Sequence, residues 1–138
     1  VPNIIGVKEA TGDLARLGQI QELVGSDFDL YTGDDATGVE FVLLGGHGSI
    51  SVTANVAPEI VSDAYEAALA GDAEKAKALD AKVADLHVKL FVEANPIPVK
   101  WAMAEMGLIG PAIRLPLTPL SEKYHDEVRQ ALKTAGAL

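Results

Sequence analysis

The amino-acid sequence predicts an α/β fold built on a parallel β-sheet, and three observations support this. Short apolar or β-branched runs occupy residues 3–8, 29–33 and 48–52, and each run ends in small or polar residues. Two segments with helical spacing of apolar residues separate the runs, and the chain is helical in pattern from residue 58 onward. Because strands that alternate with helices are joined by right-handed crossovers, this order predicts parallel strands.

The two intervening helices are predicted from apolar spacing and from stop signals. Apolar residues recur at helical spacing between residues 14 and 24, and Gly25 follows as a stop. The same spacing recurs between residues 39 and 43, where the Gly45-Gly46 pair ends the pattern. The first half of the chain therefore has the order strand, helix, strand, helix, strand.

The rest of the chain is predicted to be helical, with two breaks. Pro58 suits the first position of a helix, and Gly71-Asp72 interrupts and restarts the pattern. One further amphipathic helix is predicted from four apolar residues at steps of four, three and four: Leu79, Val83, Leu86 and Leu90. Residues 95–98 and 115–119 contain prolines and predict extended breaks around a short helix over residues 99–106. Ser121 is expected to cap the last helix.

Composition and charge exclude several classes of protein. The chain has 138 residues, enough for a real core, and a net charge of −9, which argues against a nucleic-acid surface. The absence of cysteine excludes a disulfide framework and a cysteine-based metal site. No apolar run approaches the length of a membrane span and no signal segment opens the chain, so we expect a cytoplasmic protein. Val1 enters a strand almost at once, which suggests a cut through something larger.

Polar and glycine-rich residues follow all three predicted strands. They form the segments 8–11, 33–35 and 51–55. The carboxyl ends of parallel strands meet at one edge of a sheet, which is where α/β proteins bind ligands. Asp34 and Asp35 suit either acid–base chemistry or the capping of the following helix, and capping is the more common role. His47 lies in the tight turn Gly45-Gly46-His47-Gly48 and is expected to be structural rather than catalytic. Neither His87 nor His125 has a metal partner at a useful spacing, so we assign no metal site.

Lys8 is the residue at this edge with the clearest chemical meaning. Desolvation at the end of a buried strand would favour the neutral amine, which can attack a ketone and form a Schiff base. The alternative is a lysine that lays its stem along the strand and lifts its ammonium to water. Gly33 would let a small substrate approach the backbone, or would serve a turn with positive φ.

Four segments of the sequence closely resemble the dihydrodipicolinate synthase family, which belongs to the N-acetylneuraminate lyase group of class I aldolases. They are Ile-Ile-Gly-Val-Lys-Glu-Ala-Thr-Gly-Asp at residues 4–13, Gly-Asp-Asp at 33–35, Gly-Gly-His-Gly-Ser-Ile-Ser-Val-Thr-Ala-Asn at 45–55 and Asn-Pro-Ile-Pro-Val-Lys at 95–100. The resemblance runs through the whole chain. It implies the C-terminal part of a (β/α)8 TIM barrel, with strands six to eight in residues 1–57 and the last barrel helix and a C-terminal helical extension in residues 58–138.

The resemblance also implies a site and a reaction. Lys8 occupies the position of the lysine that forms a Schiff base with pyruvate, and Gly33 and Ile50 occupy positions beside the bound pyruvate. The implied reaction condenses pyruvate with aspartate semialdehyde in lysine (diaminopimelate) biosynthesis, without metal or organic cofactor, usually in a cytoplasmic homotetramer. None of Tyr31, Tyr65 or Tyr124 matches the motif of the family's proton-shuttle tyrosine.

The length of the chain leaves two possibilities open. A TIM barrel typically needs about 250 residues, and this chain has 138. It is either the C-terminal half of a lyase that acts with its missing N-terminal half, or a non-catalytic half-barrel that assembles only with itself or with that half. Neither possibility involves nucleic acid or a membrane.

Overall fold

The structure is a computed structural model that describes residues 1–138. The chain divides into two compact units. The first, here called the sheet unit, comprises Val1–Ser51 and Ser62–Ala78, and the second, the helical unit, comprises Val52–Val61 and Leu79–Leu138. None of the helices is both long and apolar enough to cross a membrane.

The sheet unit confirms the predicted alternation of strands and helices. In chain order its first elements are β1 (Gly6–Glu9), α1 (Ala15–Val24), β2 (Asp29–Thr32), α2 (Gly38–Leu43) and β3 (Gly48–Ser49). The three strands are parallel and lie in the order β1-β2-β3, with Lys8 of β1 paired with Tyr31 of β2 and Tyr31 paired with Gly48 of β3. The strands are shorter than predicted, but ladder hydrogen bonds extend past their ends, with Gly33 N–H to Glu9 O at 2.7 Å and Ile50 N–H to Thr32 O at 2.9 Å.

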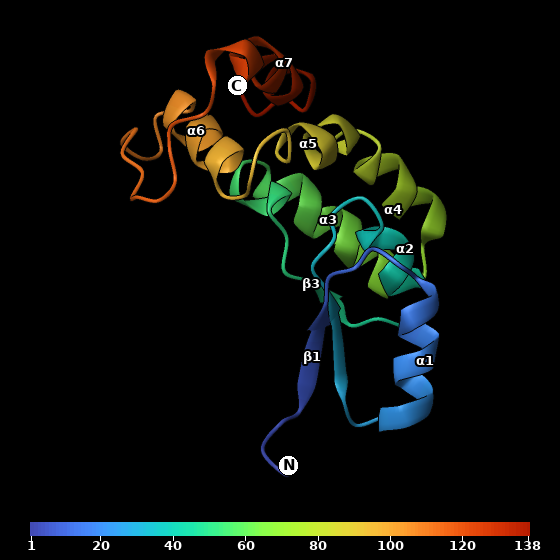
Figure 1. Cartoon of the computed structure of the whole chain (residues 1–138). Helices are drawn as coiled ribbons and strands as arrows, with labels where there is room; N and C mark the ends of the chain where they lie inside the picture. Colours follow the sequence, from blue (N-terminus) through green and yellow to red (C-terminus); the bar gives the residue numbers. More distant parts are fainter. The chain divides into compact units, whose positions relative to one another are not determined.

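One face of the sheet carries the core of this unit. Leu17 of α1, Leu30 of β2 and Phe41 of α2 are buried together, with three partly buried residues packed against them: Leu14, Ile20 and Phe28. Figure 1 shows α1 alongside the strands. The helices therefore cover the sheet face to which the side chain of Leu30 points.

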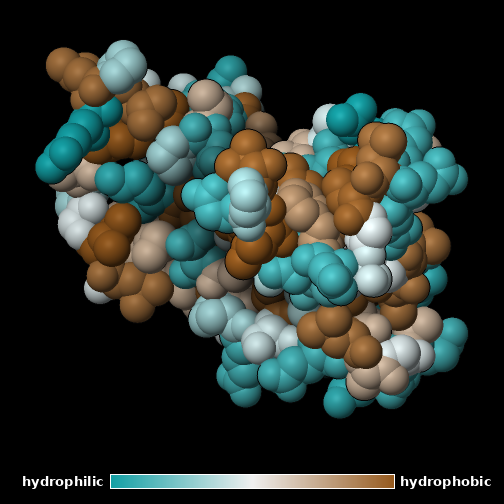
Figure 2. Space-filling model, turned by 90° about the horizontal axis from the view of Figure 1, so that it is seen from below, coloured by the Kyte–Doolittle hydropathy of each residue, from teal (hydrophilic) through white to brown (hydrophobic).

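The prediction that the first strand is buried is wrong for this chain. Ile5 is 67% exposed, and Ile4, Lys8 and Ile50 are also exposed. A parallel sheet is normally covered on both faces. Strand β1, however, lies at the edge of this three-stranded sheet and pairs with a strand on one side only. Apolar side chains reach the surface at several places on the face shown in Figure 2. Apolar side chains of residues 4–7 therefore remain exposed, because the rest of the chain does not cover them.

The remaining chain is helical, as predicted. The elements after β3 are η1 (Thr53–Asn55), α3 (Pro58–Leu69), α4 (Ala73–Asp80), α5 (Ala84–Lys89), α6 (Ile97–Glu105), η2 (Glu122–Tyr124) and α7 (His125–Thr134). In the helical unit α5 packs against α7. Its core includes six apolar residues that are 1% exposed or less: Val83, Leu86, Leu90, Ala102, Val128 and Leu132.

Three local predictions in the helical part are corrected. The single helix expected through Leu79 and Leu90 is two helices, because residues 81–83 form a turn in which Lys82 N–H bonds Leu79 O and Val83 N–H bonds Asp80 O. Helix α6 begins at Ile97, inside the expected break, since a proline in the first turn removes no intrahelical bond. Ser121 precedes η2 and makes no capping hydrogen bond, because α7 begins four residues later.

Candidate active site

The Lys8 side chain lies across Gly33, the residue that follows β2. A Cβ atom placed on Gly33 would collide with Lys8 Cε and lie 2.8 Å from Ala10 Cβ. Glycine at this position is therefore favoured by close packing against Ala10 and the lysine stem, rather than by a positive φ. The structure brings together two of the three residues that sequence reasoning singled out, on adjacent strands.

Ile50 lies at the same end of the sheet, after β3. Its N–H bonds Thr32 O, which continues the β2–β3 ladder, and its side chain is 53% exposed. Register partners in a parallel pair share a face, and so do residues two apart on one strand. Lys8, Tyr31, Gly33, Gly48 and Ile50 consequently belong to one face of the sheet, opposite the face that packs on α1. The Tyr31 ring covers Gly48, where an added Cβ would lie 3.3 Å from ring carbons.

A surface pocket of about 490 Å³ runs along β1 on this side. Its lining includes the Lys8 and Tyr31 side chains together with Asp29, and it extends along the first residues of the chain: Asn3, Ile4, Ile5, Gly6 and Val7. Lys8 is therefore accessible, and it lines an open hollow with both polar and apolar walls.

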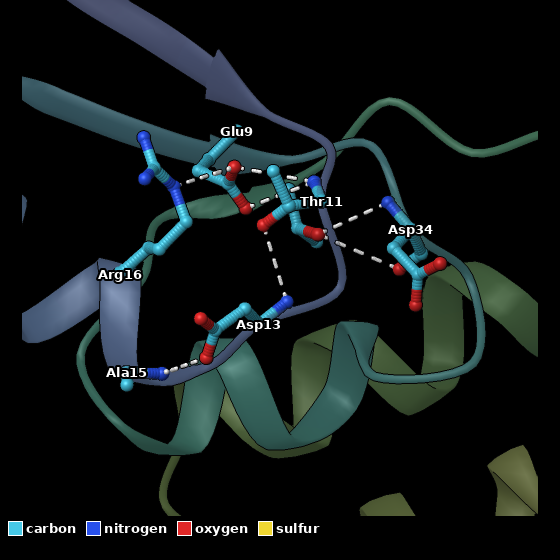
Figure 3. A network of polar contacts seen from close by, with 7 residues as sticks. Glu9, Thr11, Asp13, Ala15, Arg16 and Asp34 are labelled. Atoms are coloured by element: carbon cyan, nitrogen blue, oxygen red, sulfur yellow. Dashed lines mark hydrogen bonds and ion pairs between the residues drawn. The ribbon is translucent and has the colours of Figure 1, made fainter.

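The opposite side of the β1 end carries a network of polar contacts, shown in Figure 3. The Glu9 carboxylate accepts hydrogen bonds from Thr11 N–H at 3.1 and 3.2 Å and from Arg16 Nε at 3.3 Å. Thr11 Oγ1 accepts from Asp13 N–H at 3.2 Å, and Asp13 Oδ1 accepts from Ala15 N–H at 3.0 Å, at the start of α1. A series of hydrogen bonds thus holds the turn between β1, which carries Lys8, and α1.

The two aspartates after β2 have separate partners. Asp34 Oδ1 accepts hydrogen bonds from the N–H and the hydroxyl of Thr37, at 3.0 and 2.8 Å, at the start of α2. Asp35 is 3% exposed and accepts a hydrogen bond from Ser51 Oγ. Asp34 therefore holds the turn that precedes α2, and the expectation that it caps the helix is wrong, because the N-cap of α2 is Thr37 and no side chain caps it. Asp35 holds the segment after β3 through Ser51.

His47 has the structural role expected of it. Its ring Nδ1 accepts a hydrogen bond from the backbone N–H of Leu30 at 2.8 Å, and the backbone N–H of His47 donates to Leu30 O at 2.8 Å. Because Nδ1 is the acceptor here, Nε2 carries the proton in the neutral ring. His47 therefore links the residues just before β3 to β2 through two hydrogen bonds.

Sequence reasoning missed one buried chain of polar groups in the helical unit. Thr53 Oγ1 lies 2.8 Å from His87 Nδ1, and His87 Nε2 lies 3.1 Å from Asp80 Oδ1. Since an ionised carboxylate only accepts, Nε2 donates to Asp80 and Nδ1 accepts from the Thr53 hydroxyl. Thr53 is fully buried, so this arrangement anchors η1 rather than meeting a substrate. No cluster of three or more His, Asp or Glu residues suited to a metal is present in residues 1–138.

Comparison with known proteins gives one consistent result. The model of the dihydrodipicolinate synthetase family matches residues 1–135. The 4-hydroxy-tetrahydrodipicolinate synthases of Pseudomonas aeruginosa and Alcanivorax borkumensis are 59% and 58% identical over 138 residues, which is all of this chain and 47% of each relative. The chain therefore spans about half the length of the curated relatives that it matches.

Solved structures agree with this result. A chloride-inhibited dihydrodipicolinate synthase from Acinetobacter baumannii, complexed with pyruvate, superposes with a TM-score of 0.97 and 51% identity, covering 100% of this chain and 47% of that one. The dihydrodipicolinate synthase from Aquifex aeolicus gives 0.94 and 37%, covering 99% and 46%. These neighbours are TIM-barrel enzymes, and the α/β arrangement described above is similar to the matching part of each.

Proposed function

The chain belongs to the dihydrodipicolinate synthetase family, and from this premise we propose that it supplies the Schiff-base lysine of a pyruvate-dependent synthase. The reaction would condense pyruvate with aspartate semialdehyde in lysine (diaminopimelate) biosynthesis. The observation that carries the proposal is Lys8 at the carboxyl end of β1, with its stem against Gly33 and with Ile50 at the end of the third strand. Gly33 and Ile50 would flank the bound pyruvate.

The same proposal places the chain in the C-terminal part of the barrel. In a (β/α)8 barrel a strand follows each helix until the eighth. Here β3 is followed by α3 and then by four more α-helices with no further strand in residues 50–138. This order supports β1, β2 and β3 as strands six, seven and eight. Residues 1–57 would form the partial barrel, and residues 58–138 the last barrel helix and a helical extension.

The chemistry uses the Lys8 amine as nucleophile and would need neither a metal nor an organic cofactor. The neutral Lys8 Nζ would form a bond to the ketone carbon of pyruvate, and the ketone oxygen would leave as water. The protonated imine is an electron sink, so a methyl proton departs and an enamine forms. The enamine carbon then bonds to the aldehyde carbon of aspartate semialdehyde, whose oxygen takes up a proton. Ring closure by the semialdehyde amine at the imine carbon releases Lys8.

The proton transfers of this sequence need a positioned hydroxyl relay. We assign that role to none of Tyr31, Tyr65 and Tyr124, and propose that the N-terminal half of the barrel supplies it. The exposure of Lys8 and Ile50 in the chain described here supports this division. A pocket that excludes water from the amine would form only when the other strands complete the barrel.

Covalent trapping tests the proposal. The chain is mixed with the N-terminal half of the P. aeruginosa relative, treated with pyruvate and borohydride, and digested for peptide mapping. We expect one reduced pyruvate adduct, on the peptide that contains Lys8. An adduct confined to surface lysines such as Lys75 or Lys82, or no adduct in a complex that has formed, would overturn the assignment of Lys8.

A further inference from the structure

We propose that Glu9 is a positioning residue for Lys8, fixing the direction of the lysine from the opposite face of β1. The inference rests on the proposed function and deepens it. Neighbouring residues on a strand point to opposite faces, so the Glu9 side chain points away from the Lys8 amine. Glu9 is only 8% exposed, whereas Lys8 is exposed. The strand end is therefore held on its Glu9 side.

The Glu9 carboxylate bonds the turn that follows β1 and also the helix α1 that follows this turn. It accepts from Thr11 N–H in the turn and from Arg16 of α1, as Figure 3 shows. A buried carboxylate that lost these donors would carry a large desolvation cost. The contacts consequently resist rotation of the strand end and a slip in its register, either of which would turn the lysine away from its face.

The Glu9 backbone bonds the strand that Lys8 lies against. Glu9 O accepts from Gly33 N–H at 2.7 Å, and Gly33 is the residue crossed by the Lys8 stem. One residue thus fixes both parts of the Lys8–Gly33 contact, the strand that bears the lysine and the surface on which its stem rests. A reacting group misplaced by about 1 Å can lose on the order of 100-fold in rate.

The assignment separates a positioning role from a catalytic one. Glu9 touches no substrate in this account and exchanges no proton with Lys8. Its loss should lower the limiting rate of imine formation and leave the pyruvate concentration for half-maximal rate nearly unchanged. A residue that only contributed to folding would move the unfolding temperature and leave that limiting rate alone.

The test measures the rate of borohydride-trapped adduct formation against pyruvate concentration, in the assembly with the N-terminal half of the P. aeruginosa relative. Glu9→Met keeps the approximate size and removes the acceptor, and we expect its limiting rate to fall about 100-fold. Glu9→Gln keeps an oxygen that can accept from Thr11 N–H and should recover to within about tenfold of the unsubstituted protein. Glu9→Asp withdraws the carboxylate by one methylene and should lie between them, and it remains informative if Glu9→Met fails to fold.

A matched control is another carboxylate in an ion pair, Glu127 with Lys89 at 2.6 Å in the helical unit. Glu127→Gln should leave the trapping rate unchanged. Glu9→Met or Glu9→Asp trapping at the full rate would overturn the positioning role, as would Glu9→Gln and Glu127→Gln falling alike. If the unsubstituted assembly forms and traps nothing, the proposed function itself fails, and this inference with it.

Discussion

The 138-residue chain alone is expected to condense pyruvate with aspartate semialdehyde at least about 10⁵-fold more slowly than its assembly with the N-terminal half of the P. aeruginosa relative. Correct placement of reactants and catalytic groups is worth about 7–11 kcal/mol, and about 1.4 kcal/mol corresponds to a tenfold change in rate. Under the proposed function, the exposed Lys8 and the open pocket along β1 would provide little of that placement without the other half.

A coupled assay that follows product formation measures the difference, with each half also assayed separately. Both polypeptides are checked by intact mass, so that a trace of full-length synthase cannot supply the activity. Rapid turnover by the homogeneous chain alone would mean that its own residues complete the site. Turnover absent from the chain and from a well-formed assembly would favour the non-catalytic half-barrel instead.

Replacing Lys8 by arginine should reduce turnover of the assembly to the background rate, a loss of at least about 10³-fold. Arginine keeps the positive charge and much of the length of the side chain. Its guanidinium stays protonated at any working pH, so it offers no neutral amine to the ketone of pyruvate. The substitution therefore removes the nucleophile and changes the surrounding field little.

Lys75→Arg is the matched control, because Lys75 is an exposed lysine of α4. We expect it to retain full turnover. The assay is the same coupled measurement, with thermal unfolding recorded for each assembly. An assembly that carries Lys8→Arg, remains folded and turns over within tenfold of the unsubstituted rate would show that another group performs the chemistry.

Much of the sheet unit could be predicted from sequence, because its signals are local. Gly25 and the Gly45-Gly46 pair mark helix ends, and the alternation of short apolar runs with helical spacing specified parallel strands in the right order. That alternation also placed Lys8 and Gly33 at one end of the sheet, whereas Ile50 was singled out only by the family resemblance. The contact between the Lys8 stem and Gly33 was not foreseen, since it depends on side-chain direction.

The failures concern interactions that sequence neighbours do not determine. The apolar run before Lys8 predicted burial, yet β1 is an edge of the three-stranded sheet, and Ile4, Ile5 and Val7 stay exposed. The steps of four, three and four from Leu79 to Leu90 suit a continuous helix, and a tight turn at residues 81–83 keeps Val83 and Leu86 buried just as well. His87 and Thr53 are 34 residues apart, so no local pattern announced their hydrogen bond.

The central claim is that this chain supplies the last three strands of a Schiff-base barrel and needs the strands that precede them. Native mass spectrometry tests it most directly, with the chain mixed in turn with the N-terminal and the C-terminal half of the P. aeruginosa relative. The account predicts a stable complex with the N-terminal half only, which gains the mass of a reduced pyruvate adduct after borohydride treatment. A complex formed with the C-terminal half and not with the N-terminal half would contradict it.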